Sequence, residues 1–330
     1  MNFNKVPKIE LHCHIDGSIR PSTILDIASR ENIDIPTTDL NEFLKYVRAP
    51  KECNSLNEYL QRFGYPNMVM QSKENIERIT YEVMEDAHND NIKYIELRFA
   101  PLLHMNKGLT VEEIIESAIS GISKANEEFS IIGNLILCCM RHEDPLRSIL
   151  LVESARRYLN KGVVAIDLAG NEHDFAPELH REAFDLAKEY GFNITIHAGE
   201  TGRSENIIKS INLLHASRIG HGVNCMDNID ALNLVKEKNI TLEMCPTSNI
   251  QTKAVASYEN HPIAKFHVDG VNVNISTDNR TVSNITLNDE YKILGDIGFF
   301  NLEDYKIIYL NSVDASFADT KTKEMLRSVI

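Results

Sequence analysis

The stretch NITIHAGETGRSENIIKSINLLHASRIGHG, residues 193–222, contains two kinds of hydrophobic pattern. The short apolar runs at its ends, NITIHAG from Asn193 and SRIGHG from Ser217, predict β-strands. Between them, Ile207, Ile208 and Ile211 recur at helical spacing and predict an amphipathic helix. A strand, a helix and a second strand within about 30 residues form a βαβ unit, which indicates parallel strands.

Similar runs recur along the chain and give eight strand candidates. They begin at Ile9, Tyr94, Asn134, Val163, Asn193, Ser217, Ile240 and Val271. Helical patterns separate them, including one opened by a capping box at Thr110 and Glu113 and one that stops at Gly191. Eight such units close into a (β/α)8 TIM barrel. An open doubly wound sheet is the alternative, but no G-x-G-x-x-G or P-loop motif follows any strand.

The interval between the first and second strands is longer than the others. From Ser18 to Asn91 it holds several helical stretches, among them KENIERITYEVMEDAH at residues 73–88. We therefore predict a helical insertion after the first strand, over the mouth of the barrel. No linker, low-complexity tract or repeat interrupts the chain, so residues 1–330 are expected to form one domain.

The composition excludes several classes of function. With 43% hydrophobic and 25% charged residues, the chain is typical of a globular protein with a large core. Its formal charge of -14 would repel nucleic acid and an anionic bilayer. The N-terminus lacks the apolar region of a signal peptide, and no apolar run reaches the ~20 residues of a membrane helix. We expect a cytoplasmic protein whose six scattered cysteines are reduced.

The first predicted strand, KIELHCHIDGS at residues 8–18, has one apolar and one polar face. At period two, Glu10, His12, His14 and Asp16 lie on the same side. A surface strand with its polar side toward water is one interpretation of this pattern. A metal site built on the two histidines is the other.

The carboxyl ends of the predicted strands favour the metal site, because TIM barrels carry their chemistry at that end. These ends supply His12, His14, Asp16, Asp167, Gly170, His197, Glu200, His221, Asp278 and Asn279. Three histidines and one aspartate can surround a catalytic zinc ion and leave one position for water. The sequence therefore predicts a metal site formed by His12, His14, His197 and Asp278.

Other polar residues have simpler explanations. Glu96 and Glu243 lie inside strands and could be catalytic, but a buried ion pair with an arginine such as Arg98 is favoured. The histidines on helices and loops are expected to be structural or exposed; they are His88, His104, His142, His173, His180, His215, His261 and His267.

Six motifs occur together and in order: PKIELHCHIDGSIRP, VVAIDLAGNE, HAGE, RIGHG, LEMCPTSN and STDNRTVSN. Through them the chain resembles the adenosine deaminase family of the metal-dependent amidohydrolase superfamily, from Pro7 to beyond Tyr291. The resemblance implies a barrel that holds one zinc ion on the four residues named above. It also implies hydrolysis of adenosine and 2′-deoxyadenosine to inosine and 2′-deoxyinosine plus ammonia, in purine salvage.

The resemblance also implies roles for individual residues. Glu200 resembles the proton donor to N1 of the purine, and His221 resembles the base that orients or deprotonates the zinc water, with Asp278 beside it. His14, Asp16 and Gly170 are expected to contact the substrate, Asp16 through a ribose hydroxyl and Gly170 through its N–H to N3.

This chain departs from many family members at one position, because Asn279 stands where they carry a second aspartate. An Asn NH₂ can donate to purine N7 at any pH, so the contact is expected to persist. The insertion is expected to cover the substrate, with Leu56, Leu60 and Phe63 as candidate lining residues.

Three alternative functions compete with this interpretation. A binuclear amidohydrolase would carry a lysine at the end of the fourth strand, and VVAIDLAG has none. Within the family, adenine, a 5′-nucleotide or another 6-aminopurine could be the substrate, and Arg20, Arg203 and Arg280 are candidate phosphate contacts. A metal-stabilised interaction protein would not need both Glu200 and His221. The expected partner is a small nucleoside, and the expected assembly a monomer or small homo-oligomer.

Overall fold

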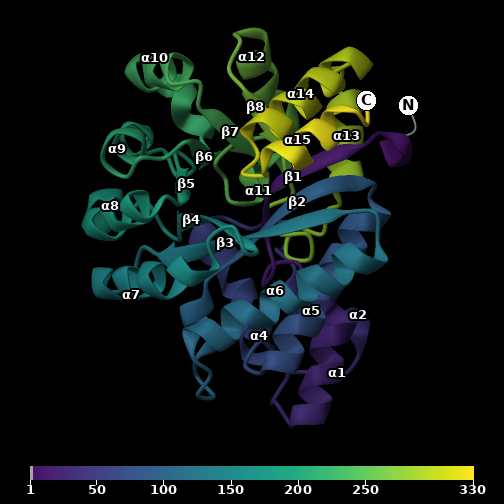
Figure 1. Ribbon diagram of the computed structural model, residues 1–330. Coiled ribbons are helices and arrows are strands. Elements are labelled where there is room, and N and C mark those ends of the chain that lie inside the picture. Colours follow the sequence, from purple (N-terminus) through teal and green to yellow (C-terminus); the bar gives the residue numbers. More distant parts are fainter. Residues whose placement is uncertain (1–2) are drawn as a thin grey trace.

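The computed structural model describes residues 3–330 as eight parallel strands that hydrogen-bond in chain order and are surrounded by helices (Figure 1). The strands are β1 (Lys8–His14), β2 (Ile92–Phe99), β3 (Ile132–Met140), β4 (Val163–Ala169), β5 (Asn193–Ala198), β6 (Arg218–His221), β7 (Thr241–Met244) and β8 (Val273–Ile275). The predicted (β/α)8 barrel is confirmed, and each predicted strand corresponds to an observed one.

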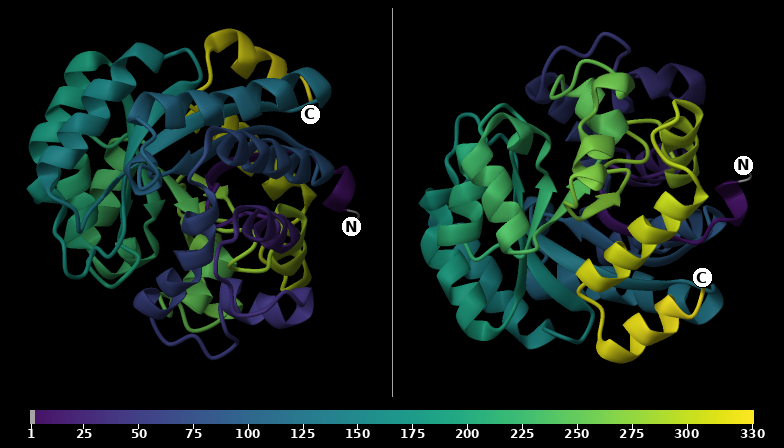
Figure 2. Two further views of the ribbon diagram at one scale, coloured as in Figure 1. Left: turned by 90° about the horizontal axis from the view of Figure 1, so that it is seen from below. Right: turned by 90° about the horizontal axis from the view of Figure 1, so that it is seen from above.

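Helices connect successive strands and cover the outside of the barrel (Figure 2). After the insertion helices they are α5 (Lys73–Asn89), α6 (Val111–Glu128), α7 (Pro145–Ala155), α8 (Arg181–Tyr190), α9 (Glu205–Leu213), α10 (Ile229–Glu237), α11 (Pro246–Gln251), α12 (Ile263–Val268), α13 (Leu287–Asp296), α14 (Leu302–Ala315) and α15 (Thr320–Arg327). The predicted capping box at Thr110 and Glu113 opens α6, and Gly191 ends α8 in the left-handed conformation with φ 88°. No helix within residues 3–330 has the length and apolarity needed to cross a bilayer.

Short 3-10 helices join several of these elements. They are η1 (Phe3–Lys5), η2 (Gln61–Phe63), η3 (Pro101–His104), η4 (Arg156–Tyr158), η5 (Pro177–His180), η6 (Val223–Asp227) and η7 (Tyr258–Asn260). Two of them, η2 and η3, contribute Phe63 and Leu103 to the wall of the cavity described below, and η6 begins two residues after His221.

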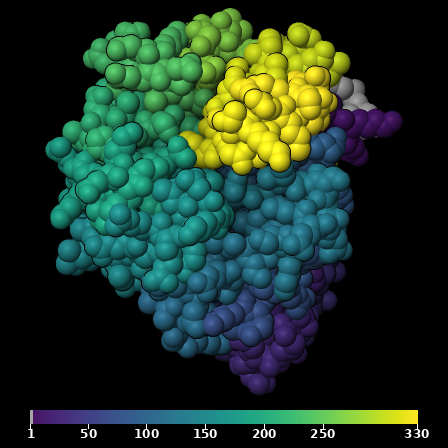
Figure 3. Space-filling model, viewed as in Figure 1, coloured from purple at the N-terminus to yellow at the C-terminus, as the bar shows by residue number. Residues whose placement is uncertain are grey.

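Both faces of β1 are buried, so the interpretation of a surface strand is wrong. Ile9 and Leu11 pack in one apolar cluster with Tyr309 of α14 and Leu326 of α15. On the opposite face Glu10 and His12 are buried and His14 is half-buried, and His12 lies against β7. The C-terminal helices, which form a continuous surface patch in Figure 3, thus cover a strand that would otherwise face solvent.

The inside of the barrel holds a buried network of ion pairs. Glu243 pairs with Arg98 at 2.9 Å and with Arg218 at 2.7 Å, and Arg218 also pairs with Glu96 at 2.5 Å. These contacts confirm the ion-pair interpretation of the two glutamates. Although burial opposes ionisation, the two guanidinium groups hold the pKa of Glu243 well below its usual range. Removal of Arg218 would leave the buried charge of Glu96 without its ion-pair partner.

The insertion after β1 is helical, as predicted, but it is shorter than the predicted interval from Ser18 to Asn91, because α5 belongs to the helices that surround the barrel. It contains α1 (Pro21–Glu31), α2 (Leu40–Val47), α3 (Leu56–Leu60) and α4 (Gly64–Val69). Figure 1 shows α1, α2 and α4 gathered at one end of the molecule, and the same segments form the purple and blue tip in Figure 3. Ser55 and Asp39 cap α3 and α2 by accepting a backbone N–H three residues on.

Candidate active site

The barrel closes between β1 and the segment that follows β8, and the candidate site lies at this closure. Beyond β8, the N–H of Asp278 donates to the carbonyl of His12 at 3.0 Å, and the N–H of His14 donates to the carbonyl of Asp278 at 2.7 Å. Asp278 has φ 61°, a left-handed conformation that aspartate tolerates better than most residues. Glu10 fixes the preceding residue by accepting from the N–H and hydroxyl of Thr277, both at 2.7 Å. We call the two backbone hydrogen bonds of Asp278 the seam.

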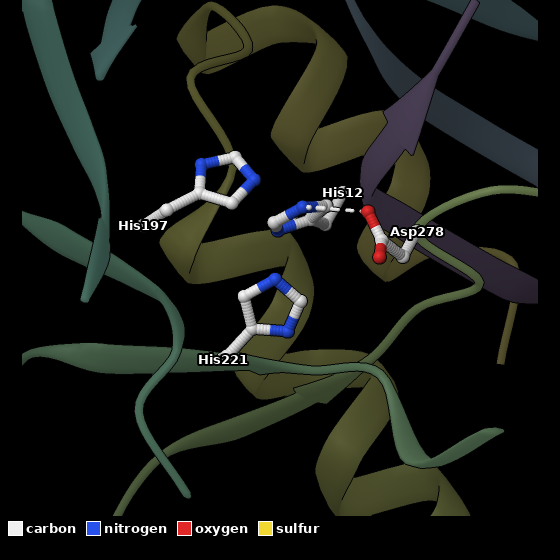
Figure 4. Close-up of side chains that lie close together, drawn as sticks. All are labelled: His12, His197, His221 and Asp278. Carbon is white, nitrogen blue, oxygen red and sulfur yellow. Dashed lines mark ion pairs between the residues drawn. The ribbon is translucent and has the colours of Figure 1, made fainter. Parts of the chain in front are cut away.

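Four buried side chains meet at this end of the barrel (Figure 4). His12, His197, His221 and Asp278 each offer one nitrogen or oxygen atom within 4.8 Å of the others. His14 lies at the edge of the group, with its Nε2 3.2 Å from His197 Nε2 and 3.4 Å from Asp278 Oδ1. The structure therefore brings together the predicted set of His12, His14, His197 and Asp278, and it adds His221 from β6.

Two atoms in this cluster are buried and have no hydrogen-bond partner within residues 3–330. His12 directs Nδ1 to Glu243 Oε2 at 2.8 Å, and its Nε2 has no partner among the described residues. Asp278 accepts a hydrogen bond from Ser248 at Oδ2, at 2.6 Å, and its Oδ1 has no partner in that part of the chain. Buried polar atoms are normally satisfied, so these two atoms fit a cation between them. The donor set of imidazole nitrogens and one carboxylate is the type that zinc binds.

Carboxylates behind the imidazoles fix their orientation. His197 Nδ1 lies 2.9 Å from Asp167 Oδ2, as His12 Nδ1 lies beside Glu243. Burial opposes ionisation of Asp167, but the neighbouring His197 and Arg98 hold its pKa below its usual range. A carboxylate on the far nitrogen is the usual support of a metal-binding histidine, since it leaves the near nitrogen free to bind.

Glu200, which lies next to the cluster, and His221, a member of it, both have shifted pKa values. Burial raises the pKa of Glu200 to about 8, and the charges of Asp278 and Glu172 add to the effect. Burial also lowers the pKa of His221 well below its usual range. Near pH 7 the pair is therefore a neutral acid and a neutral imidazole, with His221 Nε2 3.7 Å from Glu200 Oε2. His221 has φ 63°, so it joins Asp278 in the left-handed region.

A chain of buried hydrogen bonds selects the tautomer of His221. The backbone N–H of Ile263 points to His261 Nδ1 at 3.3 Å, so the His261 proton lies on Nε2 and is donated to Asn249 Oδ1 at 3.2 Å. The Asn249 amide then donates to His221 Nδ1 at 3.0 Å. This assignment, which follows from the network, leaves the His221 proton on Nε2. Sequence reasoning assigned no role to Asn249, although the quoted motif LEMCPTSN ends on it.

A cavity of about 490 Å³ opens over the cluster, within the range of small-molecule sites. Its wall includes all the predicted substrate contacts, namely His14, Asp16, Gly170 and Asn279, together with Glu200, His221 and Asp278. The insertion contributes Leu56, Leu60 and Phe63, as expected. His142 also lines the cavity, which its expected role as a structural or exposed residue did not anticipate.

Two of the predicted substrate contacts present buried atoms without partners. Asp16 Oδ1 and Asn279 Oδ1 are both buried and make no hydrogen bond within the described chain. Burial raises the pKa of Asp16 to about 7. Gly170 ends β4 with φ 102°, a backbone conformation that favours glycine. The cavity wall thus offers several polar groups that a bound molecule could satisfy.

Gly17 makes room for Asn279. A Cβ atom at position 17 would lie 1.7 Å from Asn279 Oδ1 and 2.8 Å from its Cβ, too close for rotation of the amide to relieve. We expect Gly17→Ala to displace Asn279 and lower kcat/KM about 10–100-fold, the scale of a small misplacement in an active site. Gly64→Ala is the control, because a Cβ there meets nothing within 4 Å. The measurement is the steady-state kcat/KM of the two variants, and equal values for both would contradict the expectation.

Comparison with known proteins identifies relatives over the whole chain. A statistical model of the family described as "Adenosine deaminase" matches residues 7–330. An adenosine deaminase from Clostridium botulinum (strain Okra / Type B1) is 54% identical over 100% of this chain and 98% of its own length.

Solved structures agree in fold. A zinc-bound amidohydrolase from Burkholderia ambifaria superposes with a TM-score of 0.89 at 25% identity, over 99% of this chain and 90% of that chain. An Arabidopsis N6-mAMP deaminase superposes with a TM-score of 0.88 at 28% identity, over 99% of this chain and 98% of that chain.

Proposed function

Because the chain belongs to the adenosine deaminase family, a family of metal-dependent hydrolases, we propose that it hydrolyses adenosine and 2′-deoxyadenosine to inosine and 2′-deoxyinosine, with release of ammonia, in purine salvage. We assign one zinc ion per chain to His12, His14, His197 and Asp278, all within the domain formed by residues 1–330. The observation that carries the proposal is the cluster of imidazoles and Asp278 beside a neutral carboxyl, at the wall of one cavity.

The reaction replaces the exocyclic amine of the purine by oxygen. When bound, zinc lowers the pKa of a water ligand to about 7 and so supplies a nucleophile at neutral pH. The water oxygen forms a bond to C6, and the C6–N6 bond breaks as ammonia leaves. Protonation of N1 makes the addition easier, and Glu200 is the proton donor because burial raises its pKa to about 8.

His221 is best suited to orient the oxygen that adds to C6. Its neutral imidazole carries the proton on Nε2, the nitrogen that faces Glu200, so it can donate a hydrogen bond to that oxygen. Asp278, whose Oδ1 lies 3.3 Å from His12 Nε2, would be the carboxylate of the assigned zinc ligands that accepts the proton given up by the water. The family resemblance left orientation and deprotonation open for His221, and the hydrogen-bond chain favours orientation.

Substrate contacts follow from the polar groups of the cavity wall. Asn279 donates its amide to N7, Gly170 offers its N–H to N3, and Asp16 accepts from a ribose hydroxyl. Leu56, Leu60 and Phe63 cover the base and exclude water, which strengthens these polar contacts.

A nucleoside fits the cavity better than a nucleotide. The wall of the 490 Å³ cavity includes no lysine or arginine among residues 3–330. Two of the three candidate phosphate contacts are already paired, Arg20 with Glu85 and Asp86 and Arg280 with Glu10 and Asp90. Arg203 is exposed and does not line the cavity. Adenine itself would leave Asp16 without a hydroxyl partner.

The substrate is tested by an absorbance assay with adenosine, 2′-deoxyadenosine, adenine, AMP and N6-methyl-AMP, each with and without a chelator. We expect turnover of the two nucleosides, loss of turnover with chelator and recovery on addition of zinc. Faster turnover of a 5′-nucleotide or of adenine would replace the proposed substrate by that compound. Turnover unaffected by complete metal removal would refute the assigned zinc site.

Asn279 is tested by two substitutions of opposite polarity. Asn279→Asp is expected to keep much of the activity, since a buried aspartic acid can be protonated and donate to N7. Asn279→Leu has a similar size but no donor, and kcat/KM is expected to fall about 10²-fold. The ratio of the two variants in steady-state kinetics is the measurement. Equal activity in both would remove Asn279 from the site.

The pH dependence of kcat/KM should show a basic limb. Glu200 must be protonated to donate, and burial raises its pKa to about 8. Activity is therefore retained as pH falls below this value and is lost as pH rises through about 8, the reverse of what an ionised carboxylate base would give. A profile from pH 6 to 10 checks this. Activity that stays constant up to pH 10 would contradict the role of Glu200 as an acid.

A further inference from the structure

Glu172 lies three residues beyond β4 and is buried, with 3% of its surface exposed. Its carboxylate accepts hydrogen bonds from three consecutive backbone N–H groups, those of Gly199 at 3.0 Å, Glu200 at 2.5 Å and Thr201 at 2.9 Å. The side-chain amide of Asn206, in α9, donates a fourth at 2.9 Å. Within residues 3–330 Glu172 forms no ion pair with a lysine or arginine. Its contacts therefore serve the turn that follows β5.

Asn224 binds the backbone carbonyl groups of the same turn. Its side-chain amide donates to the carbonyls of Gly199 at 3.0 Å and Glu200 at 3.1 Å, and its own N–H donates to the Gly199 carbonyl at 2.9 Å. Both backbone polar groups of Glu200 are thus bound by side chains from neighbouring loops, the N–H by Glu172 and the carbonyl by Asn224. A turn held at both groups has little freedom to move its side chain within the cavity.

The turn at residues 199–202 needs this support because two of its four residues are glycines in the left-handed backbone region. Gly199, directly before Glu200, and Gly202, two residues after it, have φ of 70° and 81° and carry no side chains. A row of backbone N–H groups that converge on one carboxylate is an anion-binding arrangement that glycine-rich turns form readily. Here the anion is supplied by the protein itself, from the loop that follows the adjacent strand β4.

We infer that Glu172 is a positioning residue for deamination: by binding the N–H groups of residues 199–201, it holds the carboxyl of Glu200 at the place from which Glu200 protonates the base. The inference rests on the proposed function. Glu172 does not line the 490 Å³ cavity, so it acts through Glu200 and not by contact with substrate.

The first test is Glu172→Gln, which keeps the shape but replaces one acceptor oxygen by a donor amide facing the N–H groups. We expect kcat to fall about 10–100-fold, with KM changed less than about 3-fold and bound zinc unchanged. Glu172→Asp keeps two acceptor oxygens on a shorter side chain and should recover part of kcat. Glu178→Gln is the matched control, since it removes a carboxylate that also contacts α9, through Lys209 at 2.6 Å, but does not touch the turn. This control should leave kcat and KM unchanged.

The second test is a double-mutant cycle with Glu200→Gln. If Glu172 acts through Glu200, the variant with both substitutions should lose no more activity than Glu200→Gln alone, because the group being positioned is already lost. Multiplied losses in the double variant would overturn the inference. So would a Glu172→Gln protein with a lower melting temperature but an unchanged kcat per zinc-loaded chain. Wild-type protein that does not deaminate any 6-aminopurine would instead overturn the proposed function.

Discussion

Glu200→Gln is expected to lower kcat about 10²–10⁴-fold, the usual contribution of a general acid. The amide cannot give up a proton to N1, yet it has nearly the same size as the buried carboxyl it replaces. The cluster of His12, His197 and Asp278 is untouched, so bound zinc and the melting temperature should remain close to those of the wild type. Loss of turnover with the metal retained is the signature expected of an enzyme.

The comparison needs kinetics and metal analysis on the same sample. Glu205→Gln, an exposed position five residues further along the chain, is the control for loss of one negative charge. Unchanged behaviour of Glu200→Gln on the true substrate would favour a metal-stabilised scaffold, the one alternative outside enzymology that the sequence leaves open.

Asp278→Asn should cause the other large loss. Asn tolerates the left-handed backbone at φ 61°, so the seam can be preserved while the charge is removed. Oδ1 of Asp278 is the carboxylate oxygen that faces His12 and His14, at 3.3 and 3.4 Å. Without its negative charge the cluster binds a divalent cation less tightly, and we expect activity to fall on the order of 10³-fold.

Zinc content after dialysis and kcat with added zinc separate the two effects of this substitution. Recovery by high zinc would indicate weakened binding alone, whereas activity that stays low in the loaded protein would show that the charge also serves the reaction. Asp227→Asn, at an exposed carboxylate of η6, is the control. Normal metal content together with normal activity in Asp278→Asn would remove Asp278 from the site.

The strands were the most predictable part of the fold. The run VVAIDLA predicted β4 at its observed bounds, Val163–Ala169, because a strand covered on both faces is nearly continuously apolar, here interrupted by Asp167 alone. The run from Val271 was less accurate, since β8 is confined to Val273–Ile275. The chain leaves the strand conformation before Asp278, whose positive φ has no counterpart in a hydrophobic pattern.

The candidate site was predictable to the extent that it depends on strand ends. Because those ends meet at one rim of a barrel, residues as distant as His12 and Asp278 could be grouped from the sequence. The supports of the site could not be inferred in this way. Asn249 and Glu172 lie in two of the quoted motifs, but their partners come from other segments, namely His221 at the end of β6 and the turn at Glu200. Such pairings depend on how loops pack, and no periodicity encodes them.

The seam has a consequence for how the protein matures. His12 and His14 of β1 form the seam with Asp278, which follows β8, and these same residues surround the proposed cation position. Closure of the barrel and completion of the cation site therefore depend on each other. During synthesis, a chain that has not yet reached residue 278 holds histidines from β1 without the carboxylate that completes their set. If the proposed zinc ion binds only the completed set, it stabilises the folded protein by a free energy that rises with the logarithm of the free zinc concentration, which links metal supply to the yield of finished barrels.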